Sequence, residues 1–95
     1  LSFIEKKALK VQKELKFQTQ LKISKSLVGG GSMPDKSLDT YILAFQGNAL
    51  KLQAQFRDKN IIGRIENDKF ILDFRTIREN ELQKLIFTIN QMEIL

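Results

Sequence analysis

The side chains best suited to chemistry are two arginines, Arg64 and Arg75, with Asp73 close to the second of them in sequence. The planar guanidinium of an arginine can hold a carboxylate or a phosphate through parallel hydrogen bonds. Two interpretations are open. Either an arginine reaches into a cleft and holds an anion there, or Arg64 pairs with Asp73 across neighbouring strands. An exposed pair of that kind contributes at most about 1 kcal/mol to stability.

A second stretch of interest is Val28–Lys36, in which Gly29, Gly30 and Gly31 precede Ser32 and the only proline of the chain. Such a run cannot continue a helix or a regular strand. We expect an ordered turn whose N–H groups could line a ligand or a neighbouring domain, with a flexible linker as the alternative. Ser32 would be a nucleophile only beside an activating base, and none is near in sequence, so we interpret it as a capping residue.

Composition restricts the possible chemistry further. The chain has no cysteine and no histidine, which removes disulfides, thiolate metal sites, and the commonest general base and metal ligand. No metal-ligand spacing, paired carboxylates or catalytic triad can be recognised, so a self-contained hydrolase or metalloenzyme is not expected. No apolar run approaches the roughly 20 residues that span a bilayer. The chain begins at Leu1 without a signal-peptide pattern, and we interpret it as a piece of a longer protein.

The net charge of +5 is concentrated in the first quarter of the chain. Residues 1–25 hold seven lysines against two glutamates, whereas residues 26–95 hold nine basic and nine acidic residues. A basic stripe can bind nucleic acid. The alternative is the solvated lysine face of an amphipathic helix, and the absence of arginine from residues 1–25 favours this alternative.

These residues must be positioned by a small set of elements. Apolar residues recur at steps of three and four over residues 1–15, which predicts a helix with Lys6, Lys10 and Lys13 on its outer side. Alternation over residues 17–24 and β-branched or aromatic residues over 40–45 predict two strands. Asn48 is a plausible N-cap for a helix over residues 49–56.

The clearest unit is a hairpin. Residues 61–66 and 69–74 flank Asn67-Asp68, a good two-residue turn, and the hydrophobic pattern fixes the register. In that register Ile61, Ile65, Phe70, Leu72 and Phe74 share the core face. Arg64 faces Ile71 on the other face, diagonally from Asp73, and Gly63 faces Leu72.

A last helix follows, with a capping box at Thr76–Glu79 and apolar residues from Leu82 to Met92 at helical spacing. The predicted order is α-β-β-α-β-β-α. We therefore expect a single α+β domain over residues 1–95, with helices on one face of a small, mainly antiparallel sheet.

Three segments in this order, Val28–Lys36, Ile61–Glu66 and Leu72–Ile77, resemble the C-terminal part of the bacterial selenocysteine synthases. The family pattern is roughly VGGGS-hydrophobic-P, then IGRI, then LDxRT. Each motif is weak alone, but the three together are fairly specific.

This resemblance implies a pyridoxal phosphate enzyme that converts seryl-tRNA(Sec) to selenocysteinyl-tRNA(Sec) with selenophosphate. It implies a cytoplasmic protein that is a homo-oligomer at full length. The cofactor lysine would lie in a large domain upstream, so the present chain would be the small domain, without catalysis or bound cofactor by itself. Arg64 and Arg75 match positions where such domains contribute an anion-binding arginine, and Gly29, Gly30, Gly31 and Ser32 would form a backbone loop near the cleft.

Two alternatives stay open at this point. The chain could be an independent basic α+β module that binds RNA through the lysine face of the first helix. It could also be the small domain of a related pyridoxal phosphate lyase.

Overall fold

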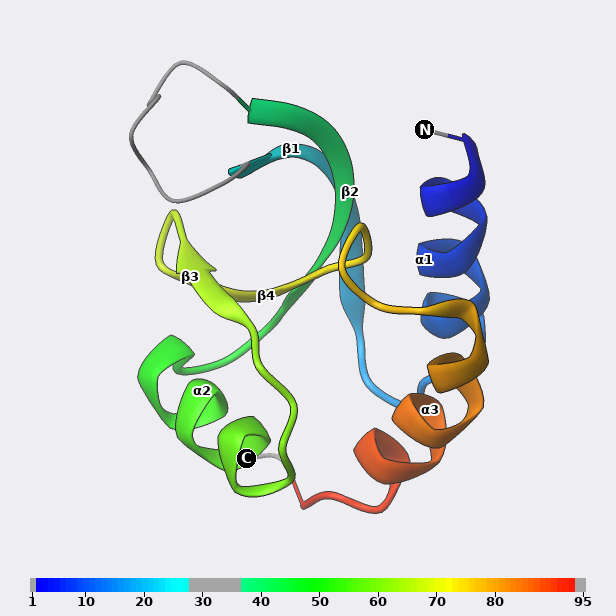
Figure 1. The fold of residues 1–95 in the computed structure, drawn as a ribbon. Coiled ribbons are helices and arrows are strands. Elements are labelled where there is room, and N and C mark those ends of the chain that lie inside the picture. Colours follow the sequence, from blue (N-terminus) through cyan, green and yellow to red (C-terminus); the bar gives the residue numbers. More distant parts are fainter. Residues whose placement is uncertain (1, 28–36, 94–95) are drawn as a thin grey trace.

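The computed structural model describes residues 2–27 and 37–93, and it has the expected α+β architecture (Figure 1). The elements run in the order α1 (Ser2–Glu14), β1 (Thr19–Leu27), β2 (Ser37–Phe45), α2 (Ala49–Asp58), β3 (Arg64–Glu66), β4 (Lys69–Asp73), the 3-10 helix η1 (Glu79–Glu81) and α3 (Leu82–Asn90). The four strands form one antiparallel sheet in the order β1-β2-β4-β3. The predicted order of helices and strands is thus confirmed.

All three helices pack on one face of the sheet. Their apolar residues meet Leu43 and Phe45 of β2 and Phe70 and Leu72 of β4 in one buried core. At the centre three rings stack at an angle to one another, with centroids 5.1 Å apart for Phe45 and Phe56 and 4.7 Å apart for Phe56 and Phe70. Most of the predicted inward residues of the helices are buried, whereas Ala49 and Gln53, also predicted to face inward from the second helix, are only half-buried. The buried ones are Ile4, Ala8, Val11 and Leu15 for the first, Leu52 and Phe56 for the second, and Leu82, Leu85, Ile86, Ile89 and Met92 for the third.

Local signals define the element ends. Asn48 caps α2 by accepting a hydrogen bond from the Lys51 N–H at 3.0 Å, as predicted. The hairpin turns at Asn67 and Asp68, both with positive φ of 50° and 63°, as a two-residue turn of the favoured hand requires. Asn90 at the end of α3 joins α1, because its side chain accepts from the Lys16 N–H and donates to the Glu14 carbonyl.

The hairpin register is the predicted one, but its first strand is shorter than predicted. Arg64 faces Ile71 and Ile65 faces Phe70, yet β3 begins only at Arg64 and residues 61–63 are not in a strand. The reason is visible at Gly63, where an added Cβ would lie 2.4 Å from the Ile71 carbonyl oxygen and 2.5 Å from the Phe70 ring. The chain crosses close above Phe70 there and cannot continue the ladder. Ile65 is half-buried rather than fully in the core.

The capping box at Thr76–Glu79 was also misplaced. The Glu81 carboxylate accepts the Arg78 N–H at 3.0 Å, two residues further along than predicted. The Thr76 hydroxyl instead donates to the Asp73 carbonyl at 3.2 Å, so it closes the turn after β4 rather than opening a helix. A threonine followed three residues later by a glutamate is the pattern of a capping box. The same threonine can instead bond to a backbone carbonyl three residues before it, and the end of β4 at Asp73 puts Thr76 in that position.

Candidate functional site

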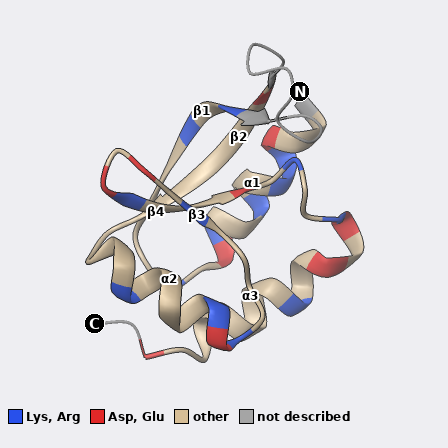
Figure 2. Ribbon diagram, turned by 60° about the vertical axis from the view of Figure 1, so that its left-hand side comes forward, with Lys and Arg blue, Asp and Glu red and all other residues tan. Residues whose placement is uncertain are grey.

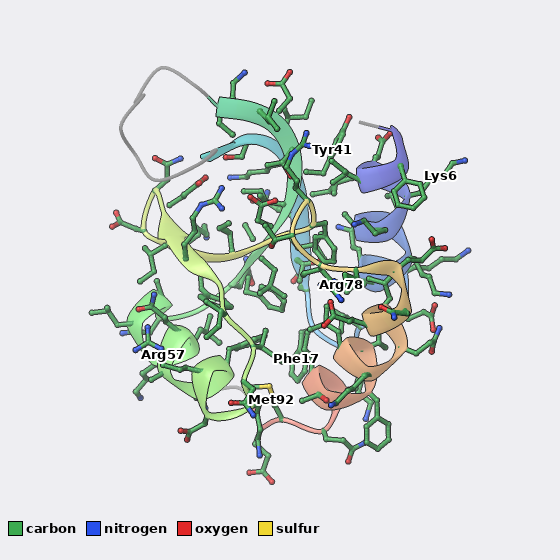
Figure 3. The ribbon with its side chains drawn as sticks, in the orientation of Figure 1. Lys6, Phe17, Tyr41, Arg57, Arg78 and Met92 are labelled. Carbon is green, nitrogen blue, oxygen red and sulfur yellow. The ribbon has the colours of Figure 1, made fainter. Side chains whose placement is uncertain are left out.

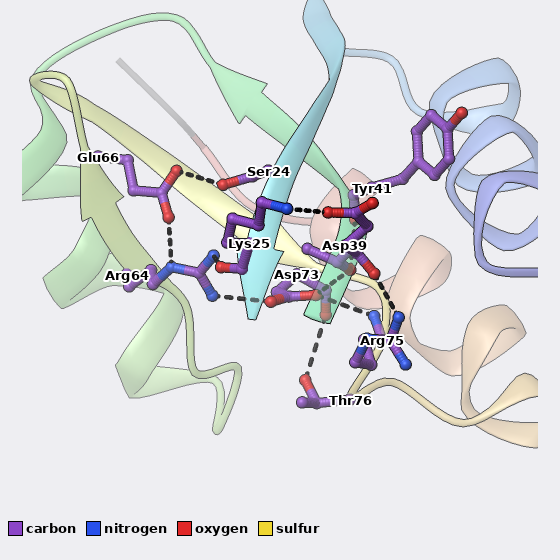
Figure 4. Close-up of polar contacts among 10 residues, drawn as sticks. Ser24, Lys25, Asp39, Tyr41, Arg64, Glu66, Asp73, Arg75 and Thr76 are labelled. Atoms are coloured by element: carbon purple, nitrogen blue, oxygen red, sulfur yellow. Dashed lines mark hydrogen bonds and ion pairs between the residues drawn. The ribbon is translucent and has the colours of Figure 1, made fainter. Parts of the chain in front are cut away.

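Asp73 is the centre of a polar network on the face of the sheet that the helices leave uncovered (Figure 4). Its side chain is buried. One carboxylate oxygen, Oδ1, accepts hydrogen bonds from the Thr40 hydroxyl at 2.6 Å and from the Arg75 backbone N–H at 2.9 Å. The other, Oδ2, accepts from Nη1 of Arg64 at 2.8 Å. We call Thr40, Arg64, Asp73 and Arg75 the Asp73 cluster.

Arg64 also binds a carboxylate of its own strand, β3, and links the cluster to one further strand, β1. Its Nε donates to Glu66 at 2.7 Å, and its Nη2 donates to the Lys25 carbonyl at 2.9 Å. The cross-strand pair between Arg64 and Asp73, one of the two interpretations from the sequence, is therefore present. Partial burial by itself would lower the pKa of Arg64, but the hydrogen bonds to Asp73 and Glu66 outweigh it and leave that pKa above its ordinary value.

The same contacts join the two edges of the sheet. β1 and β3 are the outer strands, and in a flat sheet three strand spacings would separate them by roughly 14 Å. Here Ser24 of β1 donates to Glu66 of β3 at 2.9 Å, and the sheet must roll up to allow it. Figure 1 shows β1 and β2 strongly bent. A small second apolar cluster of Ile42, Ala44 and Ile71, which are all buried, lies on this face of the sheet.

Arg75 lies two residues beyond Asp73, and its guanidinium is turned towards β2, where Nη2 donates to the Asp39 carbonyl. Its Nε is buried and has no hydrogen-bond partner within the described ranges 2–27 and 37–93. Asp39 itself is paired with Lys25, and this hydrogen bond lowers the pKa of the Asp39 carboxyl. The structure thus brings both predicted arginines to one polar network, joined through Asp73.

Lys7 is a residue that the sequence interpretation missed. It is one of the seven N-terminal lysines, yet it is buried and its Nζ donates to the Ile77 carbonyl at 2.5 Å. Burial lowers the pKa of Lys7, aided by the charge of Arg75 and opposed by Glu79 and Asp73. Its spacing of three and four residues from Ile4 and Val11 was the available signal, because it places Lys7 on the apolar stripe of α1.

Other predicted residues stand apart from this network. Gly29, Gly30, Gly31 and Ser32 lie outside the described residues. Lys6, Lys10 and Lys13 are exposed on α1, and Lys6 points outward in Figure 3. No ion pair involves these three lysines in the described part of the chain. Figure 2 shows the basic positions recurring along α1.

Within residues 2–27 and 37–93, no group of three or more acidic residues is close enough to hold a metal ion. None of the helices in that part of the chain is long and apolar enough to cross a membrane.

Comparison with known sequences places these observations in a family. A sequence profile described as L-seryl-tRNA selenium transferase matches residues 1–78, which include the Asp73 cluster. This chain belongs to that family. It is 88% identical over 93 residues to the L-seryl-tRNA(Sec) selenium transferase of Campylobacter jejuni strain 81-176, and 55% identical over 92 residues to that of Campylobacter lari. A third relative, from Campylobacter fetus, is 48% identical over 92 residues.

The match is to a small part of each relative. It covers 98% of this chain but 21% of the Campylobacter jejuni protein, so the chain spans about a fifth of the length of the curated relatives it matches. The chain is a small domain of a selenium transferase of this family, and the relatives are named as transferases that act on a seryl-tRNA.

Proposed function

We propose that the chain is the C-terminal small domain of a pyridoxal phosphate-dependent selenium transferase. The whole enzyme would convert seryl-tRNA(Sec) to selenocysteinyl-tRNA(Sec) with selenophosphate as the selenium donor. The observation that carries this proposal is the 88% identity, over 98% of this chain, to a protein named L-seryl-tRNA(Sec) selenium transferase. A homo-oligomeric full-length enzyme in the cytoplasm is part of the same proposal.

We propose that the described residues do not form a complete pyridoxal phosphate site by themselves. Such a site needs a lysine free to form the imine with the cofactor. Lys7 is buried, and its Nζ donates a hydrogen bond to the Ile77 carbonyl. Lys6, Lys10 and Lys13 on the outer side of α1 are exposed to solvent, whereas a cofactor site encloses most of its ligand. We therefore assign the cofactor to a large domain of the whole enzyme, outside the residues described here, and we assign no chemical step to these residues.

The contribution of this domain would be electrostatic. We propose that Arg75, which is half-buried, meets an anionic group of the substrates through its guanidinium when the small domain lies against the cofactor domain. Within residues 2–27 and 37–93, that guanidinium is bound at Nη2 by the Asp39 carbonyl and its Nε has no partner. Arg64 is the second candidate. Three of its five N–H groups are engaged by Glu66, Asp73 and the Lys25 carbonyl. The Gly29–Ser32 backbone would form a loop near the same cleft.

A chimera tests the proposal directly. The matching 93 residues of the Campylobacter jejuni enzyme are replaced by those of this chain, and selenocysteinyl-tRNA(Sec) formation is measured with purified components. We expect a turnover within about threefold of the parent enzyme, because the exchanged segment differs at few positions. A chimera that is folded and oligomeric like its parent but inactive would contradict the proposed function.

A second candidate function is RNA binding through the lysine face of α1. The exposed, unpaired Lys6, Lys10 and Lys13 favour it. We expect weak binding that falls steeply as salt rises, because three phosphate contacts contribute a small, counterion-driven affinity. Tight binding of RNA by this chain alone at high salt would make this the leading function instead.

A further inference from the structure

The proposed function leaves the most constrained side chain of the network, Asp73, without a role. A buried carboxylate is costly unless charged and polar donors satisfy it. Asp73 has such donors from two other strands and from the turn that follows its own, namely Thr40 of β2, Arg64 of β3 and the backbone of Arg75. Because so many donors fix this carboxylate, we look for its function in the group that it holds in place.

What Asp73 holds is the main chain of Arg75. Just before Arg75, the Phe74 N–H donates to the Tyr41 carbonyl at 3.1 Å, and the Phe74 side chain is fully buried in the core. Just after it, the Thr76 hydroxyl donates back to the Asp73 carbonyl. With its own N–H on the Asp73 carboxylate, Arg75 has a backbone fixed on both sides. Only its guanidinium can then adjust to a ligand.

No other side chain of the same size can replace this carboxylate. Oδ1 accepts from two donors and Oδ2 accepts from a guanidinium, so both oxygens of the carboxylate face N–H or O–H groups. An asparagine would present its NH₂ group either to Arg64 or to Thr40 and Arg75, and a donor would face a donor in each case. Arg64 also supplies the counter-charge, and Glu66 and the Lys25 carbonyl hold Arg64 in turn.

We propose that Asp73 is a positioning residue: Thr40 and Arg64 fix its carboxylate, and the carboxylate sets Arg75 for contact with a phosphate-like oxyanion, the selenium donor. This inference rests on the proposed role of Arg75. It separates the two predicted arginines, because Arg75 meets the ligand whereas Arg64 acts through Asp73.

The test uses the full-length chimera with five variants measured side by side, of which the fifth, Thr40→Ser, restores the hydroxyl that Thr40→Val removes. Thr40→Val removes one donor to Asp73 at nearly constant volume, and Asp73→Asn disturbs both ends of the side chain. Arg75→Ala removes the proposed ligand contact. Asn48→Ala is the matched control, since it removes one hydrogen bond at the start of α2, outside this network.

We expect the KM for selenophosphate to rise about fivefold in Thr40→Val, the equivalent of one lost hydrogen bond, and about tenfold or more in Asp73→Asn. Turnover at saturating selenophosphate and the KM for seryl-tRNA(Sec) should change less than about twofold in both. Thr40→Ser, which restores the hydroxyl, should return the KM to that of the chimera. Asn48→Ala should keep it as well. If Asp73→Asn does not fold, the comparison of Thr40→Val with Thr40→Ser still tests the inference.

The outcomes separate the two proposals. If Arg75→Ala leaves the KM for selenophosphate unchanged, the proposed role of Arg75 is wrong and the inference about Asp73 is overturned with it. If Arg75→Ala raises this KM but Thr40→Val and Asp73→Asn lower only the melting temperature or the turnover, the role of Arg75 stands and the inference alone is overturned. A KM that rises in Thr40→Val and recovers in Thr40→Ser supports the inference.

Discussion

Gly63→Ala is the most informative single substitution in the hairpin, because one methyl group there meets two groups that cannot easily move. The new Cβ would lie 2.4 Å from the Ile71 carbonyl oxygen and 2.5 Å from a carbon of the Phe70 ring. Cβ atoms in real structures essentially never approach a neighbour this closely. Phe70 is fully buried between the rings of Phe45 and Phe56, so its ring has no free space to enter.

The magnitude follows from two opposing terms. Overpacking a well-packed core costs about 1–3 kcal/mol and sometimes more. Replacing glycine by alanine recovers about 0.4–1 kcal/mol, because it restricts the unfolded chain. Gly63 is not among the residues with positive φ, so backbone strain adds nothing. Because two neighbours would have to shift, the cost lies in the upper part of that range, about 2–3 kcal/mol. After the recovered term is subtracted, we expect Gly63→Ala to lower the free energy of unfolding by about 1–2.6 kcal/mol.

Urea unfolding of the chain, followed by circular dichroism, measures this directly. The midpoint should fall while the slope m stays unchanged. A double-mutant cycle with Phe70→Leu identifies which neighbour causes the loss. If the ring is responsible, the smaller side chain should relieve part of the cost of Gly63→Ala, whereas the contact with the Ile71 carbonyl would remain. A Gly63→Ala chain as stable as the original would refute the close crossing above Phe70, and with it the explanation for the short β3.

Three further predictions concern the core, the Asp73 cluster and Lys7. Leu72→Ala should cost roughly 2–5 kcal/mol in the same unfolding assay, since Leu72 is fully buried, and a loss below 1 kcal/mol would mean that the hairpin register is wrong. Arg64→Ala should cost about 1.5–3 kcal/mol because it leaves the buried Asp73 without its guanidinium. Lys25→Ala breaks a pair whose side chains are 64% and 51% exposed, so it should cost clearly less, and equal losses would contradict the difference in burial. Lys7 has a lowered pKa in the folded chain, so as pH rises towards 10.5 the folded state releases this proton before the unfolded state does and stability gains a positive slope. Lys7→Met should remove that slope below pH 10.5, as measured by unfolding at a series of pH values, and an unchanged slope would show that Lys7 is not desolvated.

The elements and core of this fold could be predicted from the sequence because they depend on local periodicity. The steps of three and four from Ile4 to Leu15 define the buried side of α1, and the residues around Asn67-Asp68 define the hairpin register. Positions that depend on contacts distant in sequence could not be predicted in the same way. The short β3 depends on how closely Gly63 passes Phe70, and hydrophobicity carries no information about that distance.

The candidate site shows the same limit. The sequence brought Arg64 near Asp73 through the hairpin, and that contact is present. Thr40 comes from a strand 33 residues away in sequence, and nothing local links it to Asp73. Lys7 carried a helical signal that the abundance of neighbouring lysines obscured. Pairing of β2 with β4, which creates the cluster, is likewise a long-range contact without a local pattern.

The rolled sheet also has a consequence for how this chain behaves among its own copies. An open sheet edge is a template on which another chain can add a strand, and long apolar edges promote aggregation. Here one edge strand, β3, is only three residues long, and the other, β1, carries Lys22 and Lys25 and has a carbonyl already occupied by Arg64. The hydrogen bonds that connect the two edges therefore also hinder the addition of a strand from another copy. Loss of Arg64 should increase self-association of the folded chain as well as lower its stability.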